Sequence, residues 1–270
     1  MTGRRYLHRL IVLSLLVLAS VRTAVAIAAV PASELTPVDG ALCTRLQDEH
    51  VMRPGAPVRC SQLQVLRFSY AGFDGSVHDD GEIMVMAAVA PQVQTIFKLL
   101  LAHRFPLARA RLMENYHGDD AASMADNNTS AFNHRPITGG SVASLHAYGL
   151  AIDINPVQNP FIRRDAGGLV EVSPPAGKPY ATRLAVRPGM VDQEVVAIFA
   201  AHGFPIWGGD WRQPTDYQHF QVSRKMAERL AALPLKQATA YFENGILVYR
   251  RCLIKRGKTT DARKACALAG

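Results

Sequence analysis

Three side chains in two short segments are of the kinds that bind transition metals. His146 and Asp153 lie seven residues apart in the segment SLHAYGLAIDINP, and His219 lies in TDYQHFQV. A hydrolytic zinc site needs three neutral or anionic protein ligands and one open position for water. The two segments supply such a set, because pairing of the strand around Asp153 with HFQV would place His219 opposite the first two ligands.

Asp216 lies three residues before His219, at a predicted turn. A carboxylate at this place could reach a water at the metal without ligating the metal itself, which is the position of a general base. Judged from spacing alone, a single His and a single Asp on a strand are more often solvated or structural than ligands. The DxxH spacing of Asp216 and His219 favours the catalytic interpretation and leaves the structural one open.

The two segments also resemble the signatures of a known family. SLHAYGLAID resembles the SxHxxGxAxD signature of the D-alanyl-D-alanine metallopeptidases, which include vancomycin-resistance dipeptidases, carboxypeptidases and phage L-alanyl-D-glutamate endolysins. DYQHF resembles their second signature, GGDW stands just before it, and the resemblance covers about residues 63–222. It implies one zinc ion held by His146, Asp153 and His219, with Asp216 as the catalytic base. The dipeptidase branch has a glutamate as base, so the aspartate is similar to the other branches.

The segment NNTSAFNHRP resembles the part of the family that precedes the first zinc ligand and contributes an arginine near the scissile carbonyl. Arg135 is the candidate, because a fixed guanidinium could stabilise a developing oxyanion or bind a peptide carboxylate. The alternative is a loop arginine paired with a nearby carboxylate. Ser144 is similarly placed to orient substrate or a ligand.

The remaining histidines and the two tryptophans are expected to have structural roles. His134 is interpreted as a loop residue. His202 is placed at the end of a helix, where a positive charge interacts favourably with the helix dipole. Trp207 and Trp211 are expected to wall the cleft or fill a core. Four further histidines lack ligand-like companions and are predicted to lie on the surface: His50, His78, His103 and His117.

Apolar periodicity predicts the elements that position these residues. Leu150, Ile152 and Ile154 alternate along a strand and face a core, so that Asp153 projects from the opposite face. The polar segment 118–140 fits neither helix nor strand and is expected to be functional or disordered. Residues 159–190 show neither helical nor strand periodicity and are predicted to form a surface loop. Its part 162–190 is expected to decide which peptide bond of the substrate is cut. Strands are predicted at 63–73, 81–89 and 106–116, and helices at 41–51, 90–105, 191–204 and 223–233.

The chain is expected to comprise a signal peptide or anchor (1–26), a linker and N-terminal extension (27–62), a zinc peptidase domain (63–233) and a basic C-terminal extension (234–270). The first segment has arginines followed by an apolar run and then small residues, which is the order typical of a secretory signal peptide. The protein is therefore predicted to be exported to the periplasm or cell envelope, with an uncleaved anchor as the alternative. Two local disulfides, Cys43–Cys60 and Cys252–Cys266, fit an oxidising compartment.

The net charge of +8 is concentrated at the C-terminal end, where residues 224–270 carry eleven Lys or Arg against three acidic residues. Such a segment could bind an anionic wall polymer or a membrane surface. Export makes nucleic acid the least favoured partner. A solvated helix and hairpin without any partner is an equally weighted interpretation.

The expected fold is α+β, with a small antiparallel sheet carrying the zinc site and helices packed on one side. The resemblance implies the fold shared by hedgehog domains and lysostaphin-type peptidases. It also implies hydrolysis of peptidoglycan stem peptides, with D-alanyl-D-alanine carboxypeptidase preferred and an L-alanyl-D-glutamate endopeptidase as alternative. A non-catalytic zinc-containing module that binds the cell wall, and a metal-independent wall-binding protein, are the rival classes.

Overall fold

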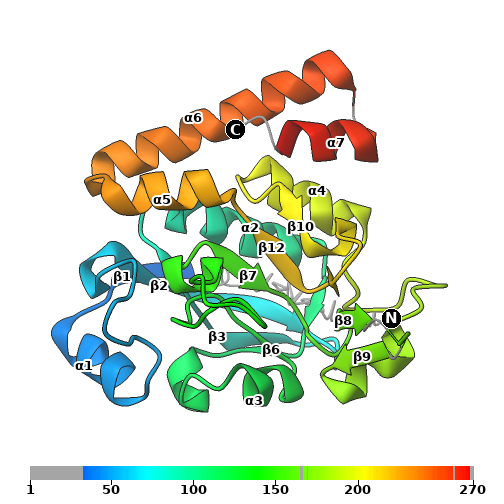
Figure 1. Ribbon diagram of the computed structural model, residues 1–270, viewed down its shortest axis with the longest axis horizontal. Helices are drawn as coiled ribbons and strands as arrows, with labels where there is room; N and C mark the ends of the chain where they lie inside the picture. The colour runs from blue at the N-terminus through cyan, green and yellow to red at the C-terminus, as the bar shows by residue number, and fades with distance from the viewer. Residues whose placement is uncertain (1–32, 165–166, 169, 258, 268–270) are drawn as a thin grey trace, which may run out of the picture. The chain divides into compact units, whose positions relative to one another are not determined.

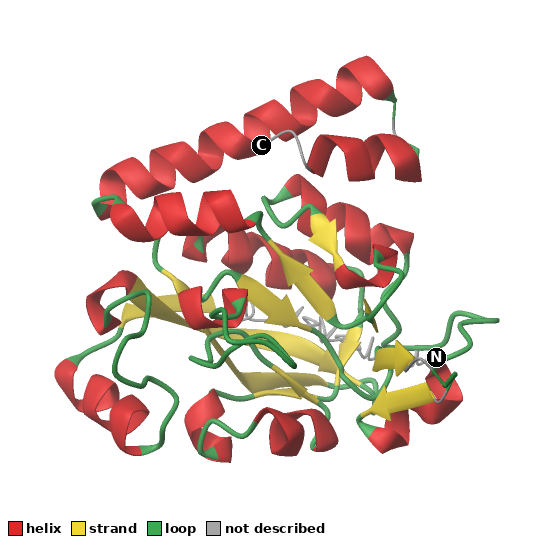
Figure 2. Ribbon diagram, viewed as in Figure 1, coloured by secondary structure: helices red, strands yellow, loops and turns green. Residues whose placement is uncertain are grey.

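The computed structural model describes residues 33–164, 167–168, 170–257 and 259–267, which lie within one compact unit. The predicted signal peptide (1–26) lies outside the described residues. No helix in the described part of the chain combines the length and apolar character needed to cross a bilayer. Helices and small sheets alternate, as expected for an α+β fold, but helices lie both above and below the strands in Figure 2 rather than on one side only.

The largest sheet is built on a long hairpin of β2 (Leu63–Gly72) and β3 (Val77–Met86). On the other edge of β2 lies β1 (Ser33–Pro37), antiparallel, and the short β4 (Pro106–Leu107) adds a parallel pair at the end of β2. The helix α2 (Ala90–Ala102) packs on β2, because its apolar residues recur at helical spacing. This layer contributes to the main hydrophobic core, which extends to the second sheet and the later helices.

A second, three-stranded sheet carries two of the predicted metal ligands. β7 (Ala151–Asp153) and β12 (His219–Gln221) pair antiparallel with His219 opposite Asp153, and β10 (Ile206–Trp207) lies on the other edge of β12. The apolar residues predicted to face a core are fully buried: Leu150, Ile152 and Ile154. Ala151 and Asp153 are buried too, so both faces of this strand are covered. The predicted pairing of HFQV with the strand of Asp153 is confirmed as well.

Two sequence predictions for the middle of the chain were wrong. The strand predicted at 106–116 is broken into β4, β5 (Arg109–Ala110) and a 3-10 turn, η2 (Met113–Tyr116). The segment 118–140, predicted to lack regular structure, contains α3 (Asp120–Ala125) and β6 (Asn128–Thr129), which pairs with β5. Buried asparagines explain the error, because their side chains bond to the backbone and allow polar residues inside.

The predicted surface loop at 159–190 also contains regular structure. β8 (Phe161–Arg164) pairs with β9 (Val170–Ser173) on one side and with β11 (Thr215–Asp216) on the other, and a 3-10 helix, η4 (Pro175–Tyr180), follows. Asp216 therefore lies on a short strand rather than in a free turn.

The C-terminal segment packs on the rest of the unit. α5 (Arg224–Ala232) is capped by Ser223, whose hydroxyl accepts a hydrogen bond from the backbone N–H of Met226. Figure 1 shows α6 (Leu235–Arg256, orange) lying along α5, with α7 (Thr260–Ala267, red) folded back beside it. One face of α6 is buried in the core, so this segment is not the freely solvated helix considered above. An anionic polymer or membrane surface as its partner stays a prediction.

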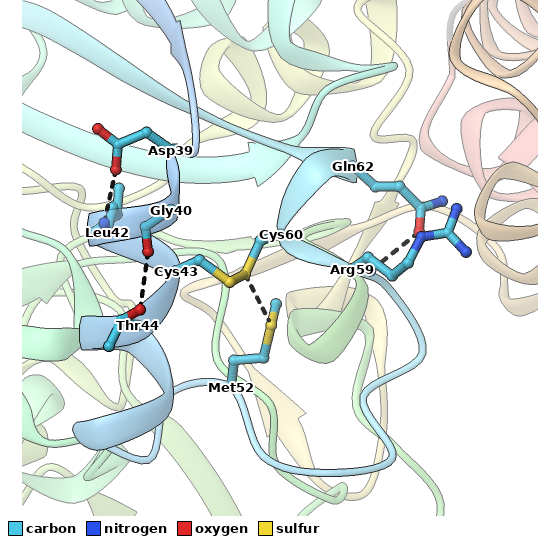
Figure 3. Close-up of a disulfide and its surroundings, with 9 residues drawn as sticks. All are labelled: Asp39, Gly40, Leu42, Cys43, Thr44, Met52, Arg59, Cys60 and Gln62. Atoms are coloured by element: carbon cyan, nitrogen blue, oxygen red, sulfur yellow. Dashed lines mark hydrogen bonds between the residues drawn. A yellow bond between two sulfur atoms is a disulfide. The ribbon is translucent and has the colours of Figure 1, made fainter.

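Both predicted disulfides are present. Cys43–Cys60 joins α1 (Gly40–Asp48) to the 3-10 turn η1 (Cys60–Gln62) that leads into β2, and Figure 3 shows Met52 beside it. Cys252–Cys266 joins α6 to α7. Elements on both sides of residues 63–233 therefore pack onto the same unit, while the domain boundaries at 62/63 and 233/234 stay predictions.

Candidate metal and active site

His146, Asp153 and His219 meet at one buried point. The Nε2 atom of His146 lies 3.1 Å from Asp153 Oδ2 and 3.2 Å from His219 Nδ1, and His219 Nδ1 lies 2.9 Å from Asp153 Oδ1. One ligand atom from each residue lies within 4.8 Å of the other two. All three side chains are buried. The residues that the sequence predicted as ligands thus form a group that could hold one metal ion.

Hydrogen bonds to the outer ring nitrogens fix both histidine tautomers. His146 Nδ1 donates to the carbonyl oxygen of Ala131 at 2.6 Å, and His219 Nε2 donates to Gln221 Oε1 at 2.8 Å. A carbonyl oxygen only accepts, so each outer nitrogen must carry its hydrogen. The inner nitrogens are then left with lone pairs directed at Asp153, which is the arrangement that metal-binding histidines show in proteins.

The charge of the group also favours a cation. Burial by itself would lower the pKa of His219, but the hydrogen bond and charge of Asp153 raise it to about 9. Burial would raise the pKa of Asp153, but the two histidines hold it far below its usual range. In the metal-free protein the stabilised positive charge is a proton held between His219 and Asp153, and release of that proton would leave two nitrogen lone pairs and one carboxylate facing the same point. A divalent metal ion fits this donor set.

The backbone turn before β7 places His146 beside this strand. The 3-10 turn η3 (Leu145–Tyr148) is capped by the Ser144 hydroxyl, which accepts a hydrogen bond from the His146 N–H at 3.3 Å. Gly149 ends the turn at φ +64°, and a Cβ there would lie 2.7 Å from the backbone nitrogen of Met86. Only glycine meets both conditions without strain, so this residue permits the turn.

The segment before the first ligand acts as a rigid support. Ser130 and Asp153 exchange two backbone hydrogen bonds, at 3.0 and 2.8 Å, and Asn133 N–H donates to the carbonyl of His146 at 3.2 Å. The side chain of Asn133 is buried and donates to Gly118 O. These contacts hold the Ala131 carbonyl against the His146 ring.

Two of the candidate metal ligands, His146 and His219, line a cleft of about 330 Å³. Asp216 lies in its wall, on β11, and the backbone of Gly208 in the turn η5 (Gly208–Asp210) packs directly behind it. A Cβ at Gly208 would lie 2.4 Å from the carbonyl oxygen of Asp216, so a larger residue would displace this strand. The residues that line the cleft are Arg135, Ile137, Thr138, Ser144, Leu145, His146, Phe161, Trp211, Pro214, Asp216, His219, Gln221 and Arg224.

The carboxyl group of Asp216 is poised to exchange a proton. Its Oδ1 atom is enclosed and has no hydrogen-bond partner among the described residues. Burial and the nearby charge of Asp153 raise the pKa of Asp216 to about 7, although the charge of His219 opposes this rise. A carboxyl group with a pKa near neutrality can take up and release a proton under ordinary conditions.

The comparisons with known proteins agree with this geometry. Residues 138–222 match the D-alanyl-D-alanine carboxypeptidase family. The matched segment contains all three candidate ligands and Asp216, and the family is one of zinc-dependent metallopeptidases. The resemblance predicted from the sequence is thus confirmed for this part of the chain. No curated protein and no solved structure gave a match.

Arg135 lies just outside the segment that matches the family and still lines the cleft. Its Nη2 atom is 3.0 Å from Asp120 Oδ2, and its Nη1 donates to Pro136 O at 3.3 Å. The Nε atom is buried without a partner in the described part of the chain. The arginine is therefore both a cleft residue and the partner of a carboxylate, which combines the two interpretations of the sequence.

Other histidines and tryptophans lie where structural roles predict. His134 bonds to the backbone of Arg53, and His202 Nδ1 donates to Ile198 O at the end of α4 (Gln193–Ala201). Trp207 is buried and donates to Tyr217 O at 2.9 Å. Trp211 lines the metal cleft, and its ring centroid is 5.4 Å from that of His219.

Sequence reasoning missed three residues of the site. Gln221 orients His219, and its position two residues after a ligand on the same strand face could have indicated this. Arg224 lines the cleft and donates to Ala143 O at 2.7 Å. Phe161 reaches the cleft because β8 pairs with the strand of Asp216, a contact that no local sequence pattern indicates.

Proposed function

We propose that this protein hydrolyses a peptide bond in peptidoglycan stem peptides with the help of one zinc ion, and that it acts as a D-alanyl-D-alanine carboxypeptidase. One observation carries the proposal. The ligand group formed by His146, Asp153 and His219 lies at a cleft that also holds the carboxyl group of Asp216, whose Oδ1 atom has no hydrogen-bond partner among the described residues. A purely structural metal site has no need of a proton acceptor beside it, so this pairing favours catalysis over the rival binding module.

In the proposed reaction His146, Asp153 and His219 hold the ion, and the other residues handle the proton and the charge. Bound zinc would polarise the scissile carbonyl and lower the pKa of the attacking water. Asp216 takes a proton from that water as its oxygen bonds to the carbonyl carbon. Arg135 stabilises the negative charge that develops on the carbonyl oxygen. Asp216 then gives the proton to the amine nitrogen as the C–N bond breaks.

The positive charges of the cleft support the carboxypeptidase assignment. Arg135 and Arg224 both line the cleft, and each has donors beyond those used in the contacts described above. A guanidinium binds a carboxylate through two parallel hydrogen bonds, so either residue suits the free end of a stem peptide. An L-alanyl-D-glutamate endopeptidase has no such requirement and is the alternative.

The two disulfides support the proposed location outside the cytoplasm, because such bonds form and persist in oxidising compartments. Export to the periplasm or cell envelope would also bring the enzyme to its proposed substrate.

Mass spectrometry of stem peptides incubated with the protein tests the function. We expect a pentapeptide ending in D-Ala-D-Ala to lose its terminal D-Ala in the presence of zinc and to stay intact with a chelator. The same peptide with an amidated C-terminus should be a poor substrate, because it lacks the carboxylate. An internal cut would establish the endopeptidase instead. Zinc binding without cleavage of any stem peptide or muropeptide would contradict the proposal.

A further inference from the structure

The C-terminal helix α7 contacts the turn that forms one wall of the metal cleft. Arg263 Nη2 lies 2.6 Å from Asp210 Oδ2, and Lys264 Nζ lies 3.3 Å from Asp210 Oδ1. Asp210 is the last residue of η5, between Gly208 and Trp211. Two cations from the last helix therefore bind one carboxylate beside the active site.

The pair formed by Arg263 and Asp210 is buried, in contrast to most ion pairs of this protein. The side chain of Arg263 is 9% exposed and that of Asp210 is 14% exposed, whereas Lys264 is 44% exposed. The Nε and Nη1 atoms of Arg263 are buried and have no partner in the described part of the chain. A buried charge with few partners depends strongly on the one it has, so Asp210 and Arg263 fix each other's position.

The position of Asp210 is passed on to the cleft through short backbone contacts. Trp211 follows Asp210 directly and lines the cleft, and its carbonyl oxygen accepts a hydrogen bond from Thr215 Oγ1 at 3.0 Å. Thr215 precedes Asp216 on β11. The carbonyl of Asp216 packs against Gly208. The turn from Gly208 to Trp211 and the strand of the proposed base thus support each other.

The helix α7 is itself held firmly. Cys266 is bonded to Cys252 on α6 and is 1% exposed, packed with Ala200 of α4 and Tyr249 of α6. The disulfide and this small cluster hold α7 where Arg263 and Lys264 reach Asp210 of η5. The basic residues near the C-terminus therefore include one whose charge points inward to the cleft wall rather than outward to a partner.

We infer that Arg263 is a positioning residue for the active-site cleft, which it serves by holding Asp210 and with it the Trp211 wall. The kinetic part of this inference rests on the proposed peptidase function, whereas the placement of Trp211 does not. Loss of the pair should loosen the wall without removing a metal ligand. Substrate binding should then weaken while zinc stays bound.

Tryptophan fluorescence gives a test that does not depend on activity. The chain has two tryptophans, so a Trp207→Phe background leaves Trp211 as the only reporter. In that background we expect Arg263→Met to shift Trp211 emission to longer wavelength and to increase its quenching by acrylamide. Arg263→Lys should restore much of the original emission, because it keeps the charge. Lys264→Met is the matched control, since it removes the exposed partner of the same carboxylate, and it should change neither signal.

Kinetics with the D-Ala-D-Ala pentapeptide complete the test on the full chain with zinc. Arg263→Met should lower kcat/KM about tenfold, mostly through KM, since small misplacements of a binding wall are costly. Zinc content should stay at one ion per chain. The double variant Arg263→Met/Asp210→Asn should have the same kcat/KM as either single variant, because both changes break the same ion pair.

Each outcome decides the inference. If Arg263→Met does not fold, Asp210→Asn removes the same pair with a side chain of the same shape and is read by the same signals. Unchanged Trp211 emission and quenching in a folded variant would overturn the inference, even if activity fell. A wild-type protein that cleaves no stem peptide would refute the proposed function, while the fluorescence would still decide whether Arg263 positions the wall.

Discussion

His219 and Asp153 lie directly opposite each other in the β7–β12 ladder, with His219 Nδ1 2.9 Å from Asp153 Oδ1. Backbone pairing therefore sets the distance between two of the three proposed metal ligands. A shift of one residue in register would turn one of the two side chains to the other face of the sheet. The geometry of the metal site is thus a direct product of strand pairing.

Replacement of His219 by alanine should abolish stoichiometric zinc binding. The remaining two ligands cannot complete the site, so zinc should no longer stabilise the fold. In the wild-type protein, free zinc at a hundredfold its Kd should add about 2.7 kcal/mol to the free energy of unfolding. Elemental analysis and thermal unfolding with and without zinc measure both effects. His103→Ala is the control, because His103 pairs with Glu194 on the surface. One retained zinc in His219→Ala would refute the ligand assignment.

Gln221→Leu should weaken zinc binding without removing a ligand. The amide oxygen of Gln221 holds the Nε2–H of His219, and loss of such an outer contact costs about 10- to 100-fold in metal affinity. Competition with a chromophoric zinc chelator measures the change. Gln237→Leu, on the exposed surface of α6, should bind zinc as the wild type does. Equal affinities of the two variants would show that Gln221 does not orient the ligand.

The metal-free protein should lose stability as the pH rises. The pKa of Asp216 is raised from 3.8 to about 7, and a folded state that binds a proton more tightly than the unfolded state loses stability between these two values. His219, raised from 6.5 to about 9, extends the same trend to higher pH.

Urea unfolding of metal-free wild type and Asp216→Asn between pH 4.5 and 7 isolates the first effect. The asparagine cannot ionise, so its stability relative to the wild type should rise with pH, by at most about 1.4 kcal/mol per unit. Asp79→Asn, at an exposed position, should show no such trend. A pH-independent difference between wild type and Asp216→Asn would contradict the raised pKa.

Two variants distinguish a direct action of Arg135 on the substrate from a role of its ion pair with Asp120. If Arg135 stabilises charge on the substrate, Arg135→Met should lower kcat about 100-fold or more, as removal of such a donor does in other enzymes. Asp120→Asn removes only the ion pair between Asp120 Oδ2 and Arg135 Nη2, which lie 3.0 Å apart, and should lower kcat much less. Equal losses of kcat in the two variants, measured with the pentapeptide, would indicate that the arginine acts only through its ion pair.

The Cys43–Cys60 disulfide should contribute to stability by restricting the unfolded chain. Its two cysteines are 17 residues apart, and a loop of about this length corresponds to about 3 kcal/mol in the chain-entropy model. We expect Cys43→Ser/Cys60→Ser to lower the free energy of unfolding in urea by about this amount. The same protein should lose nothing further at this site on addition of a reductant. An unchanged free energy of unfolding would contradict the prediction.

The metal site was predictable because its parts follow local rules. Apolar alternation at Leu150, Ile152 and Ile154 identified the strand, and all three residues are fully buried. Gly149 marked the turn that follows His146. Pairing of the short HFQV strand with the strand of Asp153 was predicted as a way to bring His219 opposite the other two residues, and the structure has this pairing.

The surroundings of the site were less predictable, because they depend on contacts between distant segments. Asn128 and Asn133 look like loop residues in the sequence, and only the structure shows that backbone groups satisfy them inside the core. The pairing of Phe161 with Asp216 and the pairing of Arg263 with Asp210 join segments about 50 residues apart. Charge counting placed Arg263 among surface cations, since composition does not show which way a side chain points.

The register of β7 and β12 also has a consequence for folding. Asp153 and His219 are separated by 66 residues, so the unfolded chain cannot bring them together at little cost in entropy. The coordination sphere comes into existence only when this distant pairing has formed, and the metal gains its full affinity at that moment. The rate at which zinc is taken up from an indicator dye during refolding would therefore report the rate of one long-range event, the pairing of β7 with β12.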